Sequence, residues 1–101
     1  MPAYLLSELR PLDPEAYAEY RRLAAPAIAA HGGRYLARGV APEVIEGDDA
    51  GFRVVLCEFE SMERLRAWYS SPEYAKALVF RDRALERRLM FVDGTGFERV
   101  E

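Results

Sequence analysis

Cysteine and histidine are nearly absent from this sequence, which contains one of each, Cys57 and His31. A single thiol cannot form an intramolecular disulfide, so a disulfide framework is excluded. A zinc site needs several clustered side chains of these two types, and the sequence has no such cluster, so we expect no metal site. Cys57 lies in an apolar, strand-like run, and we interpret it as a small buried hydrophobe rather than a reactive nucleophile.

The sequence also lacks an excess of positive charge and any long apolar run. Its net charge is -3 and its pI is about 5.3, which disfavours binding to nucleic acid or to a negatively charged membrane surface. No apolar run approaches the roughly 20 residues of a membrane-spanning helix, and the N-terminal residues do not resemble a signal peptide. We therefore expect a cytoplasmic protein.

No catalytic or cofactor-binding motif is present. Gly94 and Gly96 lack the spacing of a phosphate-binding loop, and they do not open a predicted helix. No G-x-S-x-G sequence marks a nucleophilic serine. We expect no bound cofactor, and the sequence leaves open whether the protein is an enzyme.

The length and composition are typical of a small globular protein. The chain has 101 residues, of which 50% are hydrophobic and 31% are charged. This is enough for one hydrophobic core, so we predict a single domain over residues 1–101.

Four strands are predicted from apolar and β-branched runs. The second is an interrupted edge strand, because Gly39 and Pro42 are tolerated at a bulge or an edge but not in a central strand. The predicted strands cover residues 3–10, 34–46, 52–60 and 88–93.

The first helix is predicted to start at Asp13-Pro14-Glu15. A capping side chain, a proline at the first helical position and an acidic residue in the first turn all favour a helix start there. Gly32-Gly33 ends the pattern. Pro26 removes one backbone hydrogen bond inside the helix, which predicts a kink or a break near Arg22.

The second helical region is predicted to be split in two at Ser70-Ser71. Ser61 caps its first part, and Ser71-Pro72-Glu73 repeats the cap, proline and acid pattern. The second part is predicted to fray around Arg87-Arg88, whose charges we interpret as part of a solvated, salt-bridged face. A short polar tail follows the last strand.

The order β-α-β-β-α-β predicts an α+β, ferredoxin-like fold with a four-stranded sheet and both helices on one face. The sheet face without helices would alternate to polar residues if it were in contact with water. Instead, the strand over residues 52–60 is apolar on both sides, with Val54 and Leu56 on one and Val55 and Cys57 on the other. This predicts a symmetric homodimer whose sheet faces pack together.

Three segments carry a family resemblance: GGRYLARG (32–39), VIEGD (44–48) and RVVLCEFESMERLRAWYSSPEY (53–74). With them, the chain resembles a widespread family of small bacterial proteins known only as a domain of unknown function, within the dimeric α+β barrel superfamily. Two departures are Val40, where a second glycine is usual, and the absence of a proline from the turn at residues 48–51.

The resemblance covers nearly the whole chain and implies a ferredoxin-like monomer that forms a homodimer. It implies no established activity. Members of the wider superfamily include cofactor-free monooxygenases, haem-degrading enzymes, muconolactone-type isomerases and ligand-binding or stress-induced proteins.

Arg38 and Glu58 are charged residues on strand faces that otherwise look buried. Simple alternation places Arg38 with Leu36, and Glu58 with Val54 and Leu56. The two could form a partly buried ion pair or lie on a solvated rim. Alternatively they line a cleft, where Arg38 would hold a carboxylate by bidentate hydrogen bonds and a desolvated Glu58 would exchange a proton.

His31 lies at the end of the first predicted helix. There a cation would interact favourably with the negative end of the helix dipole. The alternative is that His31 reaches the mouth of a pocket as an acid, a base or a haem ligand.

An aromatic group is predicted on the two short helices, formed by Trp68, Tyr69 and Tyr74. Core packing would explain it, and so would a shelf for a ligand, because Trp and Tyr combine an apolar face with one polar tip. The same two interpretations apply, with less weight on a ligand, to three further tyrosines: Tyr17, Tyr20 and Tyr35.

Two functions remain open at this point. The first is a homodimer that binds a small organic ligand in a sheet–helix cleft. The second is a cofactor-free enzyme of monooxygenase, isomerase or decarboxylase type. In that enzyme Arg38 would anchor the substrate anion, and Glu58 or His31 would transfer the proton.

Overall fold

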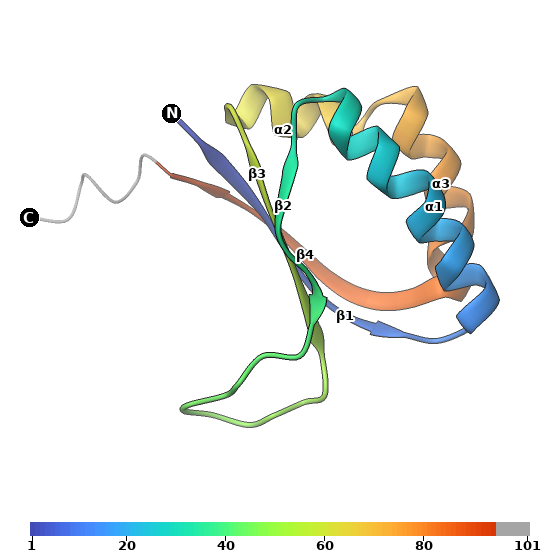
Figure 1. The fold of residues 1–101 in the computed structure, drawn as a ribbon, viewed down its shortest axis with the longest axis vertical. Helices are drawn as coiled ribbons and strands as arrows, with labels where there is room; N and C mark the ends of the chain where they lie inside the picture. Colours follow the sequence, from blue (N-terminus) through green and yellow to red (C-terminus); the bar gives the residue numbers. More distant parts are fainter. Residues whose placement is uncertain (95–101) are drawn as a thin grey trace, which may run out of the picture.

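The computed structural model describes residues 1–94, and residues 95–101, where the polar tail was expected, lie outside the described part of the chain. Within residues 1–94 the elements follow the predicted order (Figure 1). They are β1 (Ala3–Pro11), α1 (Pro14–Ala30), β2 (Arg34–Val40), β3 (Arg53–Phe59), α2 (Met62–Tyr69), α3 (Pro72–Ala84) and β4 (Leu85–Asp93).

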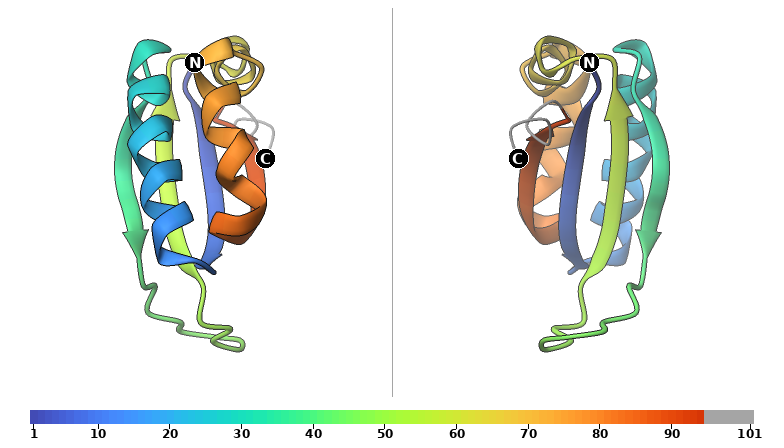
Figure 2. Two further views of the ribbon diagram at one scale, coloured as in Figure 1. Left: turned by 90° about the vertical axis from the view of Figure 1, so that its right-hand side faces the viewer. Right: turned by 90° about the vertical axis from the view of Figure 1, so that its left-hand side faces the viewer.

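The four strands form one antiparallel sheet in the order β2-β3-β1-β4. The helices lie on one face of this sheet, with α1 beside α3, and the other face carries no element of the described chain (Figure 2). This is the ferredoxin-like α+β fold, so the predicted fold class is confirmed.

Two serine caps divide the second helical region as predicted. Ser61 Oγ accepts a hydrogen bond from the backbone N–H of Arg64 at 3.2 Å, and Ser71 Oγ accepts one from Tyr74 at 3.1 Å. The Ser71 hydroxyl also donates to the carbonyl of Trp68 at 2.7 Å. Ser71 therefore closes α2 and opens α3, which fixes Trp68 and Tyr74 relative to each other.

The first helix does not break near Arg22. It runs through Pro26 as one element to Ala30. Ala27 and Ile28, beyond the proline, are 1% and 4% exposed. Their burial in the core favours the helical position of the last turns despite the missing hydrogen bond.

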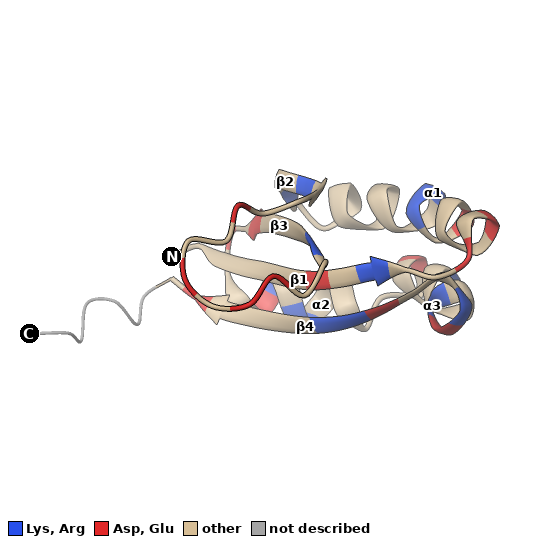
Figure 3. Ribbon diagram, turned by 90° about the horizontal axis from the view of Figure 1, so that it is seen from below, with Lys and Arg blue, Asp and Glu red and all other residues tan. Residues whose placement is uncertain are grey.

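The second strand is shorter than predicted, because it ends at Val40 rather than at residue 46. Residues 41–50 are all exposed, and they form a loop that projects away from the body of the protein (Figure 1). Pro42 removes a backbone donor just after the strand, and no strand lies beside the loop to extend the pairing. The loop carries acidic side chains (Figure 3).

The last strand begins at Leu85, so the predicted helical fraying around Arg87-Arg88 is wrong. Leu85 pairs with Pro11 and is 4% exposed. Pairing with β1 along its full length overrides the local helical pattern. As a result Arg87 shares a sheet face with Leu85 and points toward the helices rather than into solvent.

The core lies between the helices and the sheet, and its largest fully buried side chains are Trp68, Tyr74, Phe59 and Leu65. Gly33 makes room for this packing, because a Cβ at this position would lie 2.5 Å from Phe59 Cζ. None of the helices in residues 1–94 has both the length and the apolarity needed to cross a membrane.

Candidate functional site

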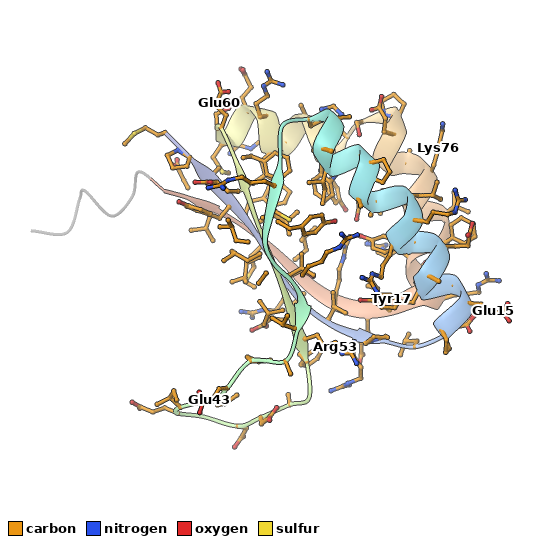
Figure 4. The ribbon with its side chains drawn as sticks, in the orientation of Figure 1. Glu15, Tyr17, Glu43, Arg53, Glu60 and Lys76 are labelled. Carbon is orange, nitrogen blue, oxygen red and sulfur yellow. The ribbon has the colours of Figure 1, made fainter. Side chains whose placement is uncertain are left out.

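A cavity of about 180 Å³ lies between α1 and the sheet. Residues of all four strands, α1 and α2 line it. Tyr17 lies on the side of α1 that faces the sheet, whereas Arg53 lies at the start of β3 (Figure 4).

Four arginines line this cavity, and no carboxylate does. They come from α1, β2, β3 and β4: Arg21, Arg38, Arg53 and Arg87. None of the four forms a salt bridge within residues 1–94, whereas Arg10, Arg34 and Arg88 each pair with a glutamate. The cavity therefore carries an uncompensated positive charge in a protein whose net charge is -3.

A β-bulge in β2 places Arg38 at the cavity. On β2, Tyr35 pairs with Cys57 and Arg38 pairs with Val55, so both share the helix-facing side of the sheet. The register shifts between Tyr35 and Ala37, which leaves Leu36 as the extra residue. Strict alternation would have put Arg38 on the opposite face. A second shift follows at Gly39, whose φ is +68°.

Arg87 is half-buried and donates hydrogen bonds to two phenols. Its guanidinium reaches the Tyr20 hydroxyl at 2.8 Å and the Tyr74 hydroxyl at 2.6 Å. The two hydroxyl oxygens lie 2.6 Å apart. Burial raises the pKa of Tyr20 far above its ordinary value, with the adjacent Tyr74 adding to the shift and Arg87 opposing it. Tyr20 is therefore a neutral hydroxyl at physiological pH.

Ser7 and Trp68 contribute two unpaired polar groups to the cavity wall. Ser7 Oγ and Trp68 Nε1 are buried and have no hydrogen-bond partner within residues 1–94. Both residues line the cavity.

The predicted aromatic group is packed around Trp68. Its ring lies 4.2 Å from that of Tyr74 and 5.9 Å from that of Tyr69, between centroids. Trp68 alone of the three lines the cavity. Tyr74 is fully buried behind it and contributes through Arg87 and Tyr20, while Tyr69 is 37% exposed.

Glu58 is not brought together with Arg38. It lies on the uncovered face of the sheet, where Arg34 donates to its carboxylate at 2.8 Å and 2.6 Å. The Tyr4 hydroxyl donates to it at 3.5 Å. An ion pair between strand residues was one prediction for Glu58, and its partner is Arg34 rather than Arg38.

His31 is also outside the cavity. Its Nε2 lies 3.2 Å from a carboxylate oxygen of Glu73, near the start of α3. The hydrogen bond from His31 lowers the pKa of Glu73. This contact links the C-terminal end of α1 to the N-terminal end of α3.

Cys57 lies on β3, where it pairs with Leu5 and Tyr35, and it is fully buried in the core. Desolvation raises the pKa of its thiol to about 12, and Arg38 only partly opposes this effect. The thiol is therefore protonated at physiological pH and is a poor nucleophile. No group of His, Cys, Asp and Glu side chains in residues 1–94 is arranged to hold a metal ion.

Sequence reasoning missed Arg87, and it gave no separate role to Ser7. The signal for Ser7 was available, because it is the one polar residue in the alternating series Ala3, Leu5, Ser7, Leu9. Arg87 had no comparable signal, since its position depends on where α3 gives way to β4.

The profile of a family described as a domain of unknown function (DUF1330) matches residues 2–95 of the sequence. No curated protein matches the chain at a significant level.

Several solved structures share the fold. A protein of unknown function from Rhodopseudomonas palustris is 23% identical with a TM-score of 0.74, over 91% of this chain and 81% of that one. SnoaB, a cofactor-independent oxygenase from Streptomyces nogalater, is 10% identical with a TM-score of 0.65, over 92% of each chain. A dimeric ferredoxin-like protein of unknown function from Thermobifida fusca is 14% identical with a TM-score of 0.61, over 92% of this chain and 91% of that one. These likenesses establish the fold alone.

Proposed function

The chain belongs to the DUF1330 family, to which no function is assigned, and from its own residues we propose that it binds a small organic anion in the cavity between α1 and the sheet. The observation that carries this proposal is the set of four arginines around one cavity with no carboxylate among them. A site built this way favours an anion over a neutral or cationic ligand of the same shape.

Arg38 is the principal anchor in this proposal. Its guanidinium lies 4.6 Å from the centre of the Tyr35 ring, at the exposed side of the cavity. Stacking on the ring restricts the guanidinium, so less conformational entropy is lost when it holds a carboxylate through two hydrogen bonds. The tyrosines and Trp68 then supply the apolar wall for the organic part of the ligand.

Calorimetry with a matched pair of probes tests the anion preference. Cyclohexanecarboxylate is expected to bind, and the neutral cyclohexylmethanol is not. Arg38→Gln should weaken carboxylate binding by about 10-fold or more, as expected for a lost charged hydrogen bond of about 1.5–3 kcal/mol. Arg66→Gln, on α2 and outside the cavity lining, is the control. Equal binding of the two probes would refute the proposal.

We also propose that the protein is a homodimer with the uncovered sheet faces packed together. The middle of this face is apolar, with Leu6 paired to Leu56 on one side and to Met90 on the other. Charged residues at its ends pair with one another, as in Glu8 with Arg88. The Thermobifida fusca protein of the same fold is described as dimeric, which supports a dimer here.

Sedimentation of the protein and of Leu56→Glu tests this assembly. The wild-type chain should sediment as a dimer at micromolar concentration, and the variant as a monomer, because its carboxylate would be buried without a partner. A monomeric wild-type protein would refute the proposal. Val79→Glu, at a 79% exposed position on α3, should leave the dimer intact.

A cofactor-free enzyme is the second candidate function. It is supported by the shared fold with a cofactor-independent oxygenase and by the presence of Arg38 in the cavity. The version that uses Glu58 or His31 for proton transfer has lost its support, because both lie outside the cavity lining. Because burial raises the pKa of Tyr20, its hydroxyl stays protonated and cannot serve as the base in place of these residues.

Oxygen uptake separates simple binding from an enzyme of oxygenase type. With 4-hydroxybenzoate as the probe and no added cofactor, an enzyme of oxygenase type would consume oxygen at a rate above the protein-free control. Under the binding proposal, 4-hydroxybenzoate binds and no oxygen is consumed.

A further inference from the structure

The anion site leaves two buried polar groups unexplained. Ser7 and Trp68 are 2% and 1% exposed, and both line the cavity. Neither Ser7 Oγ nor Trp68 Nε1 has a hydrogen-bond partner within residues 1–94. Buried polar groups are nearly always paired in folded proteins, because leaving one unpaired is unfavourable. The partner of these two groups is therefore expected inside the cavity.

A third donor comes from counting the protons of the phenol pair. Tyr20 and Tyr74 carry two hydroxyl protons, and the contact between them uses only one. Arg87 donates to both oxygens, so it cannot accept the second proton. Tyr20 lines the cavity and Tyr74 does not. If Tyr74 donates to Tyr20, the proton of Tyr20 is free to point into the cavity.

The buried part of the wall therefore offers donors. An indole N–H only donates, a guanidinium only donates, and a serine hydroxyl can do so. A group that satisfies this wall must be an acceptor, such as a carbonyl or ether oxygen.

Resting on the proposed function, we propose that the ligand is an organic acid with a second, acceptor oxygen remote from its carboxylate. The exposed arginines, Arg38 among them, hold the carboxylate, while Trp68 Nε1 and Ser7 Oγ donate to the second oxygen. The cavity volume of about 180 Å³ is close to the roughly 150 Å³ of an engineered cavity that binds benzene. A cavity of this size suits a single small ring or a short chain. With a carbonyl oxygen as the acceptor, the ligand class is an oxo acid.

A matched pair of acids tests this assignment by calorimetry. Cyclohexanecarboxylate and 4-oxocyclohexanecarboxylate share a ring and a carboxylate, and only the second has an acceptor oxygen at the far end. We expect the oxo acid to bind wild-type protein about 5- to 10-fold more tightly, as expected for a neutral hydrogen bond or two.

Two variants assign that preference to the buried donors. Ser7→Ala and Trp68→Phe should each reduce the preference for the oxo acid toward about twofold or less, with cyclohexanecarboxylate affinity much less affected. Ser70→Ala is the control, because it removes an exposed serine hydroxyl that donates to the Arg66 carbonyl. Arg38→Gln should weaken the binding of both acids by the same factor and leave the ratio of their affinities unchanged.

The outcomes separate this inference from the proposed function. If both acids bind wild-type protein equally, the inference is overturned and water is the partner of the two buried groups, while the anion site stands. If neither acid binds, the anion site itself is refuted and the inference falls with it. A preference that persists in both Ser7→Ala and Trp68→Phe would also overturn the assignment.

Discussion

The hydroxyl oxygens of Tyr20 on α1 and Tyr74 on α3 lie 2.6 Å apart, and Arg87 on β4 donates to both of them. This contact joins the two long helices to the edge of the sheet at the wall of the cavity. It also compensates for burying a guanidinium that has no carboxylate partner within residues 1–94, since each phenol oxygen accepts one of its protons.

Tyr74→Phe tests how much this hydrogen-bond network contributes to the stability of the fold. The variant removes an acceptor of Arg87 and the partner of Tyr20 while keeping the buried ring. We expect the free energy of unfolding to fall by about 1–3 kcal/mol, as for other buried donors left unpaired. Urea denaturation measures the loss. Tyr69→Phe is the control at a 37% exposed hydroxyl, and an equal loss in both variants would contradict the network's role.

Ser7→Ala should raise the stability of the ligand-free protein, whereas Tyr74→Phe should lower it. The serine hydroxyl is buried without a partner in residues 1–94, so its removal relieves a desolvation penalty. We expect the ligand-free variant to be more stable by about 1 kcal/mol. Thermal unfolding checks this, and a clearly less stable variant would show that the hydroxyl already has a partner, such as water, in the free protein.

Much of the fold follows from local chemistry that the sequence displays. The caps at Ser61 and Ser71 act within a few residues of themselves, so their effect needs no knowledge of the tertiary structure. The apolar run predicted as a strand over residues 52–60 is likewise a local signal, because a short run of apolar and β-branched residues favours a strand by itself. These signals predicted the element order correctly, and that order determines the ferredoxin-like arrangement.

The site was harder to predict, because its residues depend on non-local pairing. Arg38 reaches the cavity through a bulge at Leu36, and nothing in the sequence marks a one-residue shift of register. Glu58 does follow simple alternation with Val54 and Leu56, and it therefore lies on the uncovered face of the sheet, opposite to the face of Arg38. Arg87 has a basic, helix-favouring neighbourhood, and only pairing with β1 makes it a strand residue. For Trp68 the sequence left core packing and a ligand shelf both open, and the structure has it fully buried at the cavity wall.

Cys57 should be almost inert toward alkylation in the folded protein. Burial raises the pKa of its thiol to about 12, against an ordinary value near 8.5, so about one molecule in ten thousand carries a thiolate at pH 8. The rate of reaction with iodoacetamide should therefore keep rising about 10-fold per pH unit from pH 7 to pH 10. Protein unfolded in urea is the control, and its rate should level off above about pH 9. A plateau at that pH in folded protein would contradict the raised pKa.

Gly39 determines whether Arg38 keeps its position at the cavity. Its φ is +68°, a conformation that L-residues disfavour. An added Cβ would lie 3.6 Å from the Tyr17 hydroxyl, an ordinary contact, so the cost of Gly39→Ala is conformational rather than steric. We expect the variant to lose about 1 kcal/mol of stability. Gly39→Asn should lose less, because asparagine tolerates this region better than alanine.

The same variant can also change ligand binding. If Gly39→Ala relieves the strain by losing the bulge, Arg38 moves away from the cavity and the affinity for cyclohexanecarboxylate falls. Denaturation and calorimetry on both variants measure the two effects, and an alanine variant as stable as the wild type would show that the positive φ at Gly39 carries no strain.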